Sequence, residues 1–220
     1  LDGCEHSVFE IISNSIDEAR EGFGKKIIIT KFSDGSIEVQ DFGRGAPVDF
    51  NNKEQCFNWE LLYCELYAGG KYDNNSEDAA YEFSLGLNGL GACATQFSSQ
   101  YMTVKSYSKG TVSSISFEKG FPVTELEVRP IERKEKKTGT IIRWKPDLAV
   151  FTDINIPFEY YDNVLKKQAI VNSGLKFILK FQNDDGQFQT HEYYYEKGIS
   201  DYVETLAGTT AFTQTVNLSG

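Results

Sequence analysis

The first segment of the chain is strongly amphipathic. Between Glu5 and Glu21, apolar residues recur at the spacing of one face of an α-helix. The residues of this face are Val8, Ile11, Ile12, Ile16 and Ala19. Such a face must be buried against another element of the fold. The segment therefore predicts a helix that packs on a second layer.

The second layer is predicted by runs rich in β-branched and aromatic residues. Residues 26–32 and 37–41 flank the turn Ser33-Asp34-Gly35-Ser36 and predict a hairpin. Further strands are expected over 101–107, 112–118, 125–129, 140–145, 175–182 and 188–194, and further helices over 59–67, 92–98, 158–171 and 199–206. Because short turns join most successive strands, we predict an α+β fold, a two-layer sandwich with helices on one face of a mixed, mainly antiparallel sheet.

Length, charge and cysteine content restrict the functions that this chain can have. The 220 residues suit one domain, and the net charge of −10 argues against a broad surface that tracks nucleic-acid phosphates. The four cysteines include no C-x-x-C pair and the histidines number two, so we expect no zinc site and free thiols in a reducing cytoplasm. No apolar run approaches the ~18 residues of a membrane span. Because the chain begins at Leu1 and ends at Gly220, we expect a fragment of a longer protein.

One stripe of the predicted first helix is polar and carries His6, Glu10, Asn14 and Asp17. A solvated face is the simpler interpretation of such a stripe, but solvated faces usually mix lysine with glutamate at this spacing. The oxygen of Asn14 can ligate Mg²⁺, while Glu10, one turn away, can polarise an attacking water. His6, another turn earlier, could orient that carboxylate.

Two glycine-containing loops could hold a ligand. The loop from Asp41 to Pro47 places a carboxylate at a strand end, where it could accept a hydrogen bond from an exocyclic amine, or could simply form a turn. The loop from Gly86 to Gly91 precedes a short predicted helix, so its amides could bind phosphate. The sequence contains neither a P-loop nor a dinucleotide-binding fingerprint. Thr140 could share a water with Asp41, or be an ordinary strand threonine.

Read together, four motifs resemble the ATP-site motifs of the superfamily of gyrase, Hsp90, histidine kinases and MutL (the GHKL, or Bergerat, fold). The motifs are Glu10-x-x-x-Asn14, Asp41-x-Gly43-x-Gly45, Gly86-x-x-Gly89-x-Gly91 and Thr138-Gly139-Thr140. Within the superfamily, the segments 9–19, 68–72 and 137–140 look like the B subunits of bacterial type IIA topoisomerases, of either the gyrase or the topoisomerase IV kind. The resemblance covers nearly the whole chain, from about Cys4 to Val203.

The resemblance implies a role for each matching residue. Glu10 would be the general base with His6 as its helper, and Asn14 would ligate Mg²⁺. Asp41 would receive the adenine amine, with Thr140 acting through a water. The residues implied to bind the nucleotide are Asn14, Asp17, Glu18, Asp41, Gly43, Arg44, Gly45, Ala46, Pro47, Lys71, Gly86, Leu87, Asn88, Gly89, Leu90, Gly91, Thr140 and Ile142. Among them, Arg44 would pair with Glu18 and cover the adenine.

By the same resemblance, the activity would be ATP binding and Mg²⁺-dependent hydrolysis that drives a DNA gate, in supercoiling or decatenation. The partners would be a second copy of the subunit, a gyrase A-type subunit and DNA in the full-length enzyme, without a membrane. Residues 1–206 would form the ATP-binding domain, and 207–220 would begin the connection to a transducer domain.

Departures from the family pattern include Asn88 in place of a typical histidine, Glu82 in place of a typical lysine and Ser108 in place of a typical arginine. Two alternatives stay open, and the changes at Asn88 and Glu82 bear on the second. One is an ATPase of the chaperone or mismatch-repair type, and the other is a non-catalytic nucleotide-sensing module.

Overall fold

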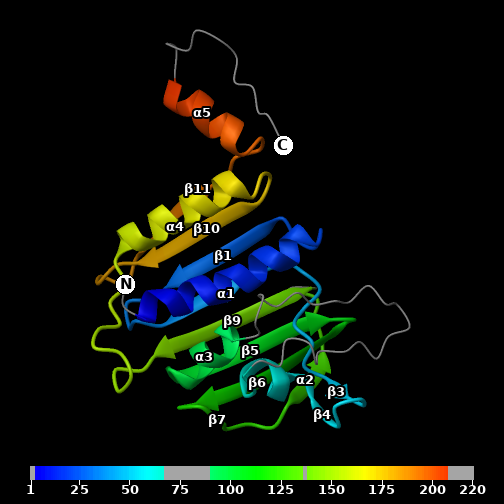
Figure 1. The fold of residues 1–220 in the computed structure, drawn as a ribbon. Helices are drawn as coiled ribbons and strands as arrows, with labels where there is room; N and C mark the ends of the chain where they lie inside the picture. Colours follow the sequence, from blue (N-terminus) through cyan, green and yellow to red (C-terminus); the bar gives the residue numbers. More distant parts are fainter. Residues whose placement is uncertain (1–2, 67–89, 136–137, 208–220) are drawn as a thin grey trace.

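The computed structural model describes residues 3–66, 90–135 and 138–207, and Figure 1 shows their arrangement. The helices are α1 (Gly3–Arg20), α2 (Asn58–Tyr63), α3 (Gly91–Phe97), α4 (Phe158–Val171) and α5 (Ile199–Ala207). The strands are β1 (Lys26–Lys31), β2 (Ile37–Gln40), β3 (Phe50–Asn51), β4 (Cys56–Phe57), β5 (Ser99–Ser108), β6 (Thr111–Glu118), β7 (Phe121–Pro122), β8 (Glu127–Pro130), β9 (Gly139–Pro146), β10 (Lys176–Gln182) and β11 (Phe188–Tyr193).

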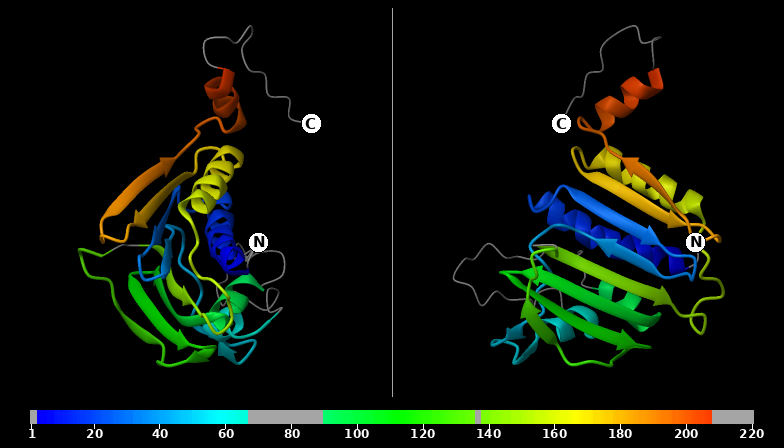
Figure 2. Two further views of the ribbon diagram at one scale, coloured as in Figure 1. Left: turned by 90° about the vertical axis from the view of Figure 1, so that its left-hand side faces the viewer. Right: turned by 180° about the vertical axis from the view of Figure 1, so that it is seen from behind.

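A single large sheet forms one layer of the fold. Its strands follow the order β11-β10-β1-β2-β9-β5-β6-β7, with β8 also paired to β6, while β3 and β4 form a separate ribbon. The pair β1–β10 is parallel, with Ile27 opposite Phe177, and the other pairs of this sheet are antiparallel. Figure 2 shows α1 and α4 on the same face of the sheet. The predicted α+β class, with helices on one face of a mixed and mainly antiparallel sheet, is therefore confirmed.

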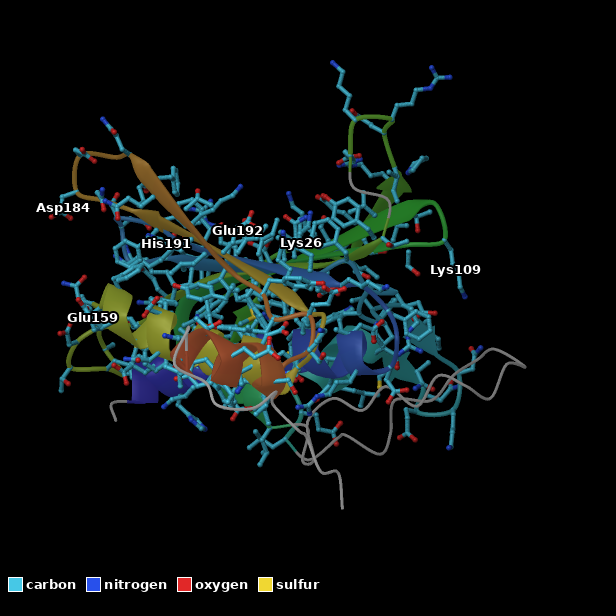
Figure 3. All side chains as sticks on the ribbon, turned by 90° about the horizontal axis from the view of Figure 1, so that it is seen from above. Lys26, Lys109, Glu159, Asp184, His191 and Glu192 are labelled. Carbon is cyan, nitrogen blue, oxygen red and sulfur yellow. The ribbon has the colours of Figure 1, made fainter. Side chains whose placement is uncertain are left out.

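The core lies between α1 and the middle of the sheet. Val8 and Ile12 of α1 are fully buried, as are Ile29 of β1 and Trp144 of β9. Ala19, near the end of the helix, is only partly buried. The predicted apolar face of this helix is thus confirmed up to its last turn. Figure 3 shows the other side of the layer, where charged residues such as Glu192 lie on the sheet face away from the helices.

Helix α1 ends in a Schellman motif. The N–H of Phe23 donates to the carbonyl of Glu18 at 3.1 Å, and the N–H of Gly22 donates to the carbonyl of Ala19 at 3.0 Å. Gly22 has a φ of 91°, in the left-handed region that glycine adopts without a Cβ clash. The motif turns the chain directly into β1, so the end of α1 and the start of the sheet are held at a fixed angle.

Some elements differ from the prediction. The helix expected over 59–67 ends at Tyr63, because Cys64 closes the last hydrogen bond to Glu60 with non-helical dihedral angles, and the apolar residue Leu66 is 53% exposed rather than buried. The two-residue strands β3, β4 and β7 were not predicted, since segments this short carry no periodic signal. Of the glycine-containing loop expected from Gly86 to Gly91, only Leu90 and Gly91 are described.

All four cysteines are free thiols. Burial raises the pKa of Cys64 and of Cys93 to about 11, and each thiol also lies near an acidic side chain. Both thiols therefore stay protonated at neutral pH and react slowly as nucleophiles.

Within the described residues, none of the helices has the length and apolar character needed to cross a bilayer.

Two neighbouring tyrosines of α4 differ in the hydrogen bonding of their hydroxyls, so we expect their phenylalanine variants to differ in stability. The hydroxyl of Tyr160 donates to the carbonyl of Glu5 at 2.6 Å, whereas the buried hydroxyl of Tyr161 has no hydrogen-bond partner among the described residues. We expect Tyr160→Phe to lower the free energy of unfolding by about 0.5–1.5 kcal/mol, and Tyr161→Phe to leave it unchanged or raise it by about 1 kcal/mol. Urea unfolding measures both values, and a larger loss for Tyr161→Phe would contradict the assignment.

Candidate functional site

Three polar residues of α1 stand one helical turn apart. Glu10, Asn14 and Glu18 are spaced by four residues, so they form a ladder of about 12 Å along one side of the helix. Because the apolar face of α1 packs on the sheet, the helix cannot rotate, and the direction of this ladder is fixed. The ladder could bind an elongated ligand that carries different chemical groups at its two ends.

A cavity opens beside the C-terminal half of this ladder. It encloses about 400 Å³, counting the part that is open to solvent. The residues that line it are Ile11, Asn14, Ser15, Glu18, Asp41, Gly45, Ala46, Leu62, Tyr63, Thr140 and Ile142. Apolar side chains alternate with a few polar groups on these walls. Such a lining suits a flat, largely apolar ligand that carries hydrogen-bonding edges.

Asp41 lies on the cavity wall and is 8% exposed. Its Oδ1 accepts hydrogen bonds from the backbone N–H of Gly43 at 2.9 Å and of Thr140 at 3.0 Å. The bond to Gly43 makes the turn that a simpler interpretation of Asp41 predicted. The bond to Thr140 brings the loop and β9 together, so the predicted proximity of these two residues is confirmed. The carboxylate therefore serves as a structural anchor and also faces the cavity.

The hydroxyl of Thr140 is held in the same corner. Its Oγ1 accepts a hydrogen bond from the N–H of Ala46 at 2.9 Å, and Ser106 donates to the carbonyl of Ala46 at 2.6 Å. The hydroxyl hydrogen of Thr140 can still be donated to a ligand or a water. These bonds hold the loop from Asp41 to Pro47 against the sheet at the place where the polar edge of a ligand would bind.

A buried ion pair closes this end of the site. Glu18 is 6% exposed, and both of its carboxylate oxygens accept hydrogen bonds from the Arg44 guanidinium, from Nε at 2.8 Å and from Nη2 at 2.9 Å. The backbone N–H of Arg44 adds a third bond to the same carboxylate at 2.8 Å. The predicted pairing of Arg44 with Glu18 is confirmed. Its bidentate geometry holds the guanidinium in one plane.

The other end of the ladder is more open. Nε2 of His6 lies 3.0 Å from Oε1 of Glu10, and the two side chains are 72% and 33% exposed. The contact between them is as expected, although a catalytic role for either remains a prediction. Glu10 also packs against the first residue of α3, because a Cβ at Gly91 would stand 2.1 Å from its Oε2 and 2.8 Å from its Cβ. The absence of a side chain at Gly91 thus allows α3 to approach Glu10.

The structure sorts the predicted site residues into three groups. Those that line the cavity are Asn14, Glu18, Asp41, Gly45, Ala46, Thr140 and Ile142. Described candidates outside this lining are His6, Glu10, Asp17, Gly43, Arg44, Pro47, Leu90 and Gly91. Lys71, Gly86, Leu87, Asn88 and Gly89 fall outside the described residues. Asp17 instead lies 3.7 Å from Arg20 on the same helix.

Four lining residues were not predicted. Ile11, on the apolar face of α1, lies three residues before Asn14, and Ser15 lies four residues after Ile11, so helical spacing could have identified both. Leu62 and Tyr63 come from α2, and no local pattern connects that helix to the cavity.

Comparison with known proteins identifies relatives over almost the whole chain. No family model matches. The DNA gyrase B subunit of Thermotoga maritima is 34% identical over 205 residues, which are 93% of this chain and 30% of that protein. The DNA topoisomerase 4 B subunit of Francisella tularensis is 35% identical over 205 residues, which are 93% of this chain and 31% of that protein. The chain therefore spans about a third of the length of these curated relatives.

A solved structure is similar as well. The 43K ATPase domain of Thermus thermophilus gyrase B, in complex with an aminocoumarin, superposes with a TM-score of 0.76 at 25% sequence identity. The match covers 93% of this chain and 49% of that one. The predicted resemblance thus extends to the three-dimensional arrangement of the strands and helices.

The contact between Gly91 and Glu10 predicts how a methyl group added at Gly91 changes the stability of the fold. Alanine normally stabilises a helix by up to about 1 kcal/mol relative to glycine. At Gly91, however, the new Cβ overlaps Glu10, including the Cβ atom of Glu10, which cannot rotate away. We expect Gly91→Ala to lower the free energy of unfolding by about 1–3 kcal/mol, as overpacking does.

The Glu10→Ala background is the control, because it removes the nearest atom of the overlap. There Gly91→Ala should cost clearly less, as chemical denaturation of the four proteins would measure. Equal costs in both backgrounds would contradict the contact.

Proposed function

We propose that this chain, which belongs to the family of ATPase domains of bacterial type IIA topoisomerase B subunits, binds ATP in the cavity beside α1 and hydrolyses it with Mg²⁺. The observation that carries the proposal is the corner made by Asp41, Thr140 and Ala46. A buried carboxylate and a hydroxyl stand there on the wall of a mostly apolar cavity, with their positions fixed by backbone hydrogen bonds. Adenine offers a flat apolar face and an amine donor at its edge, which matches this corner.

The two ends of the α1 ladder fit the two ends of the nucleotide. Adenine would lie near Asp41 and Glu18, and the phosphates would extend toward Asn14 and Glu10. Gly91 and Leu90 border that direction, and the preceding loop residues are proposed phosphate ligands from the sequence resemblance. The spacing of about 12 Å between Glu10 and Glu18 is comparable with the length of an extended ATP molecule.

Mg²⁺ would be held by Asn14 together with phosphate oxygens and waters. The described residues contain no group of three His, Cys, Asp or Glu side chains that could hold a metal ion. This composition fits Mg²⁺, which usually binds through few protein ligands together with substrate phosphates. When bound, the ion neutralises negative charge on the phosphates.

Glu10 is the proposed general base. Its carboxylate would accept a proton from the water that attacks the terminal phosphate. His6, at 3.0 Å, would keep that carboxylate oriented by a hydrogen bond. This exposed contact can adjust when a ligand arrives.

In the whole protein, ATP binding would close a gate between two copies of the subunit around a DNA segment, and hydrolysis would reset it. Residues 1–206 would be the ATP-binding domain, and 207–220 would lead to a transducer domain. A gyrase A-type subunit would be a partner in the full-length enzyme. The relatives favour this family over the chaperone and mismatch-repair ATPases, and both supercoiling and decatenation remain compatible with them.

The role of Glu10 predicts a separation of binding from hydrolysis. Glu10→Gln keeps the size of the side chain but cannot accept the proton. We expect ATP hydrolysis by the full-length subunit to fall by about 10² or more, while nucleotide affinity stays nearly unchanged. Glu21→Gln, on an exposed position just after the same helix, should retain full activity. Undiminished hydrolysis by Glu10→Gln would point to a different base, whereas Mg²⁺-dependent nucleotide binding without hydrolysis by the unmodified subunit would point to the non-catalytic nucleotide-sensing module.

The position of Asp41 predicts a preference for adenine over guanine. Guanine presents a carbonyl where adenine presents its amine, and a carboxylate would repel it. In Asp41→Asn, the two backbone donors should orient the amide with its oxygen toward them, so that the NH₂ group faces the ligand. We expect this variant to bind ATP about 10- to 100-fold more weakly and to lose its discrimination against GTP. Calorimetry with both nucleotides tests this, and equal affinity of the unmodified chain for ATP and GTP would remove Asp41 as the base reader.

A further inference from the structure

The α1–β1 turn contains an exposed aromatic residue with no role in the core. Phe23 is 40% exposed, although phenylalanine is among the residue types most often buried. The Schellman motif at the end of α1 fixes its backbone through the bond to the carbonyl of Glu18. The ring is therefore presented at a defined place next to the cavity, and burial does not explain it.

The Phe23 ring stacks on Arg44. The guanidinium carbon of Arg44 lies 3.9 Å from the ring centroid, well inside the range of a cation–π contact. The carboxylate of Glu18 binds the edge of the same guanidinium through Nε and Nη2. Glu18 thus holds Arg44 in its plane, and Phe23 supports it from one face. Glu18 and Phe23, which the C-terminal end of α1 connects, therefore determine where this cation lies.

The turn also contacts the backbone of the Asp41 loop. A Cβ at Gly24 would lie 3.0 Å from the carbonyl carbon of Phe42 and 3.3 Å from the nitrogen of Gly43. On the same side, Nζ of Lys26 lies 4.3 Å from the centroid of the Phe42 ring. The α1–β1 turn therefore packs along the outer side of the loop, and Phe23 extends this support to the Arg44 side chain.

We infer that Phe23 is a positioning residue for nucleotide binding, which acts by holding the Arg44 guanidinium against the adenine. The inference rests on the proposed function, and it takes from the family resemblance the expectation that Arg44 covers the base. Neither Phe23 nor Arg44 is among the residues that line the cavity, but Glu18, which binds the Arg44 guanidinium, does line it. The effect of Phe23 on a ligand therefore passes through Arg44. Residue 23 must then be aromatic for full affinity, because only a flat ring can stack on the guanidinium from this turn.

The test is calorimetric binding of the non-hydrolysable analogue AMPPNP with Mg²⁺ to this chain. Phe23→Leu keeps an apolar side chain but removes the π face, and we expect it to weaken binding about two- to fivefold. Phe23→Tyr keeps the ring and should retain the original affinity. Phe188→Leu is the matched control, because Phe188 is 46% exposed but lies on the edge strand β11, opposite Gln182 at the end of β10, whereas the α1–β1 turn lies beside the start of β10. This variant should change nothing.

A double-mutant cycle shows whether the effect passes through Arg44. Arg44→Lys keeps a positive charge near buried Glu18, so the variant should fold, but it loses the planar group that stacks on the ring. In this background Phe23→Leu should have no further effect. The same loss in both backgrounds, or unchanged binding by Phe23→Leu in the original chain, would overturn the inference and leave the proposed function standing. Failure of the unmodified chain to bind AMPPNP would overturn both.

Discussion

The packing of α1 on the sheet determines the geometry of the candidate site. Val8 and Ile12 are fully buried, and α1 packs against β1 and β2, so the helix cannot rotate without exposing them. The ladder of Glu10, Asn14 and Glu18 therefore has a fixed direction relative to the sheet. Burial of each aliphatic side chain contributes about 1.5–3 kcal/mol, more than an exposed polar contact of the ladder provides. The apolar face thus positions the polar one.

The two ends of the ladder differ in how firmly they are held. At one end, the Glu18–Arg44 pair is buried, and removing either partner would leave an uncompensated charge at a cost of about 3–5 kcal/mol. At the other end, the His6–Glu10 contact is largely exposed and contributes little to stability. The proposed base-binding end is therefore rigid in the described structure, whereas the proposed hydrolytic end is held weakly. Such a difference in rigidity between the two ends is expected of a site that binds one end of its ligand before the other.

Local patterns in the sequence predicted α1, α4 and the β1–β2 hairpin because each carries a clear periodicity within one segment. The pairing of Arg44 with Glu18 was expected only from the family resemblance. The remaining features depend on pairing between strands that lie far apart in the sequence. Strand β9 inserts between β2 and β5, and β10 joins β1 in parallel, neither of which a local pattern specifies. For the same reason, the contributions of Leu62 and Tyr63 to the cavity could not be predicted.

The insertion of β9 also has a consequence for synthesis on the ribosome. Thr140, which holds Asp41, follows it by 99 residues, and β10, which covers the other side of β1, comes later still. During translation, α1 and the first hairpin emerge before the strands that complete their sheet. Their apolar surface must then remain uncovered for seconds, at ordinary elongation rates of about 5–20 residues per second. The nascent chain cannot form the Asp41 corner during this interval, and it is a natural client for chaperones that shield apolar segments.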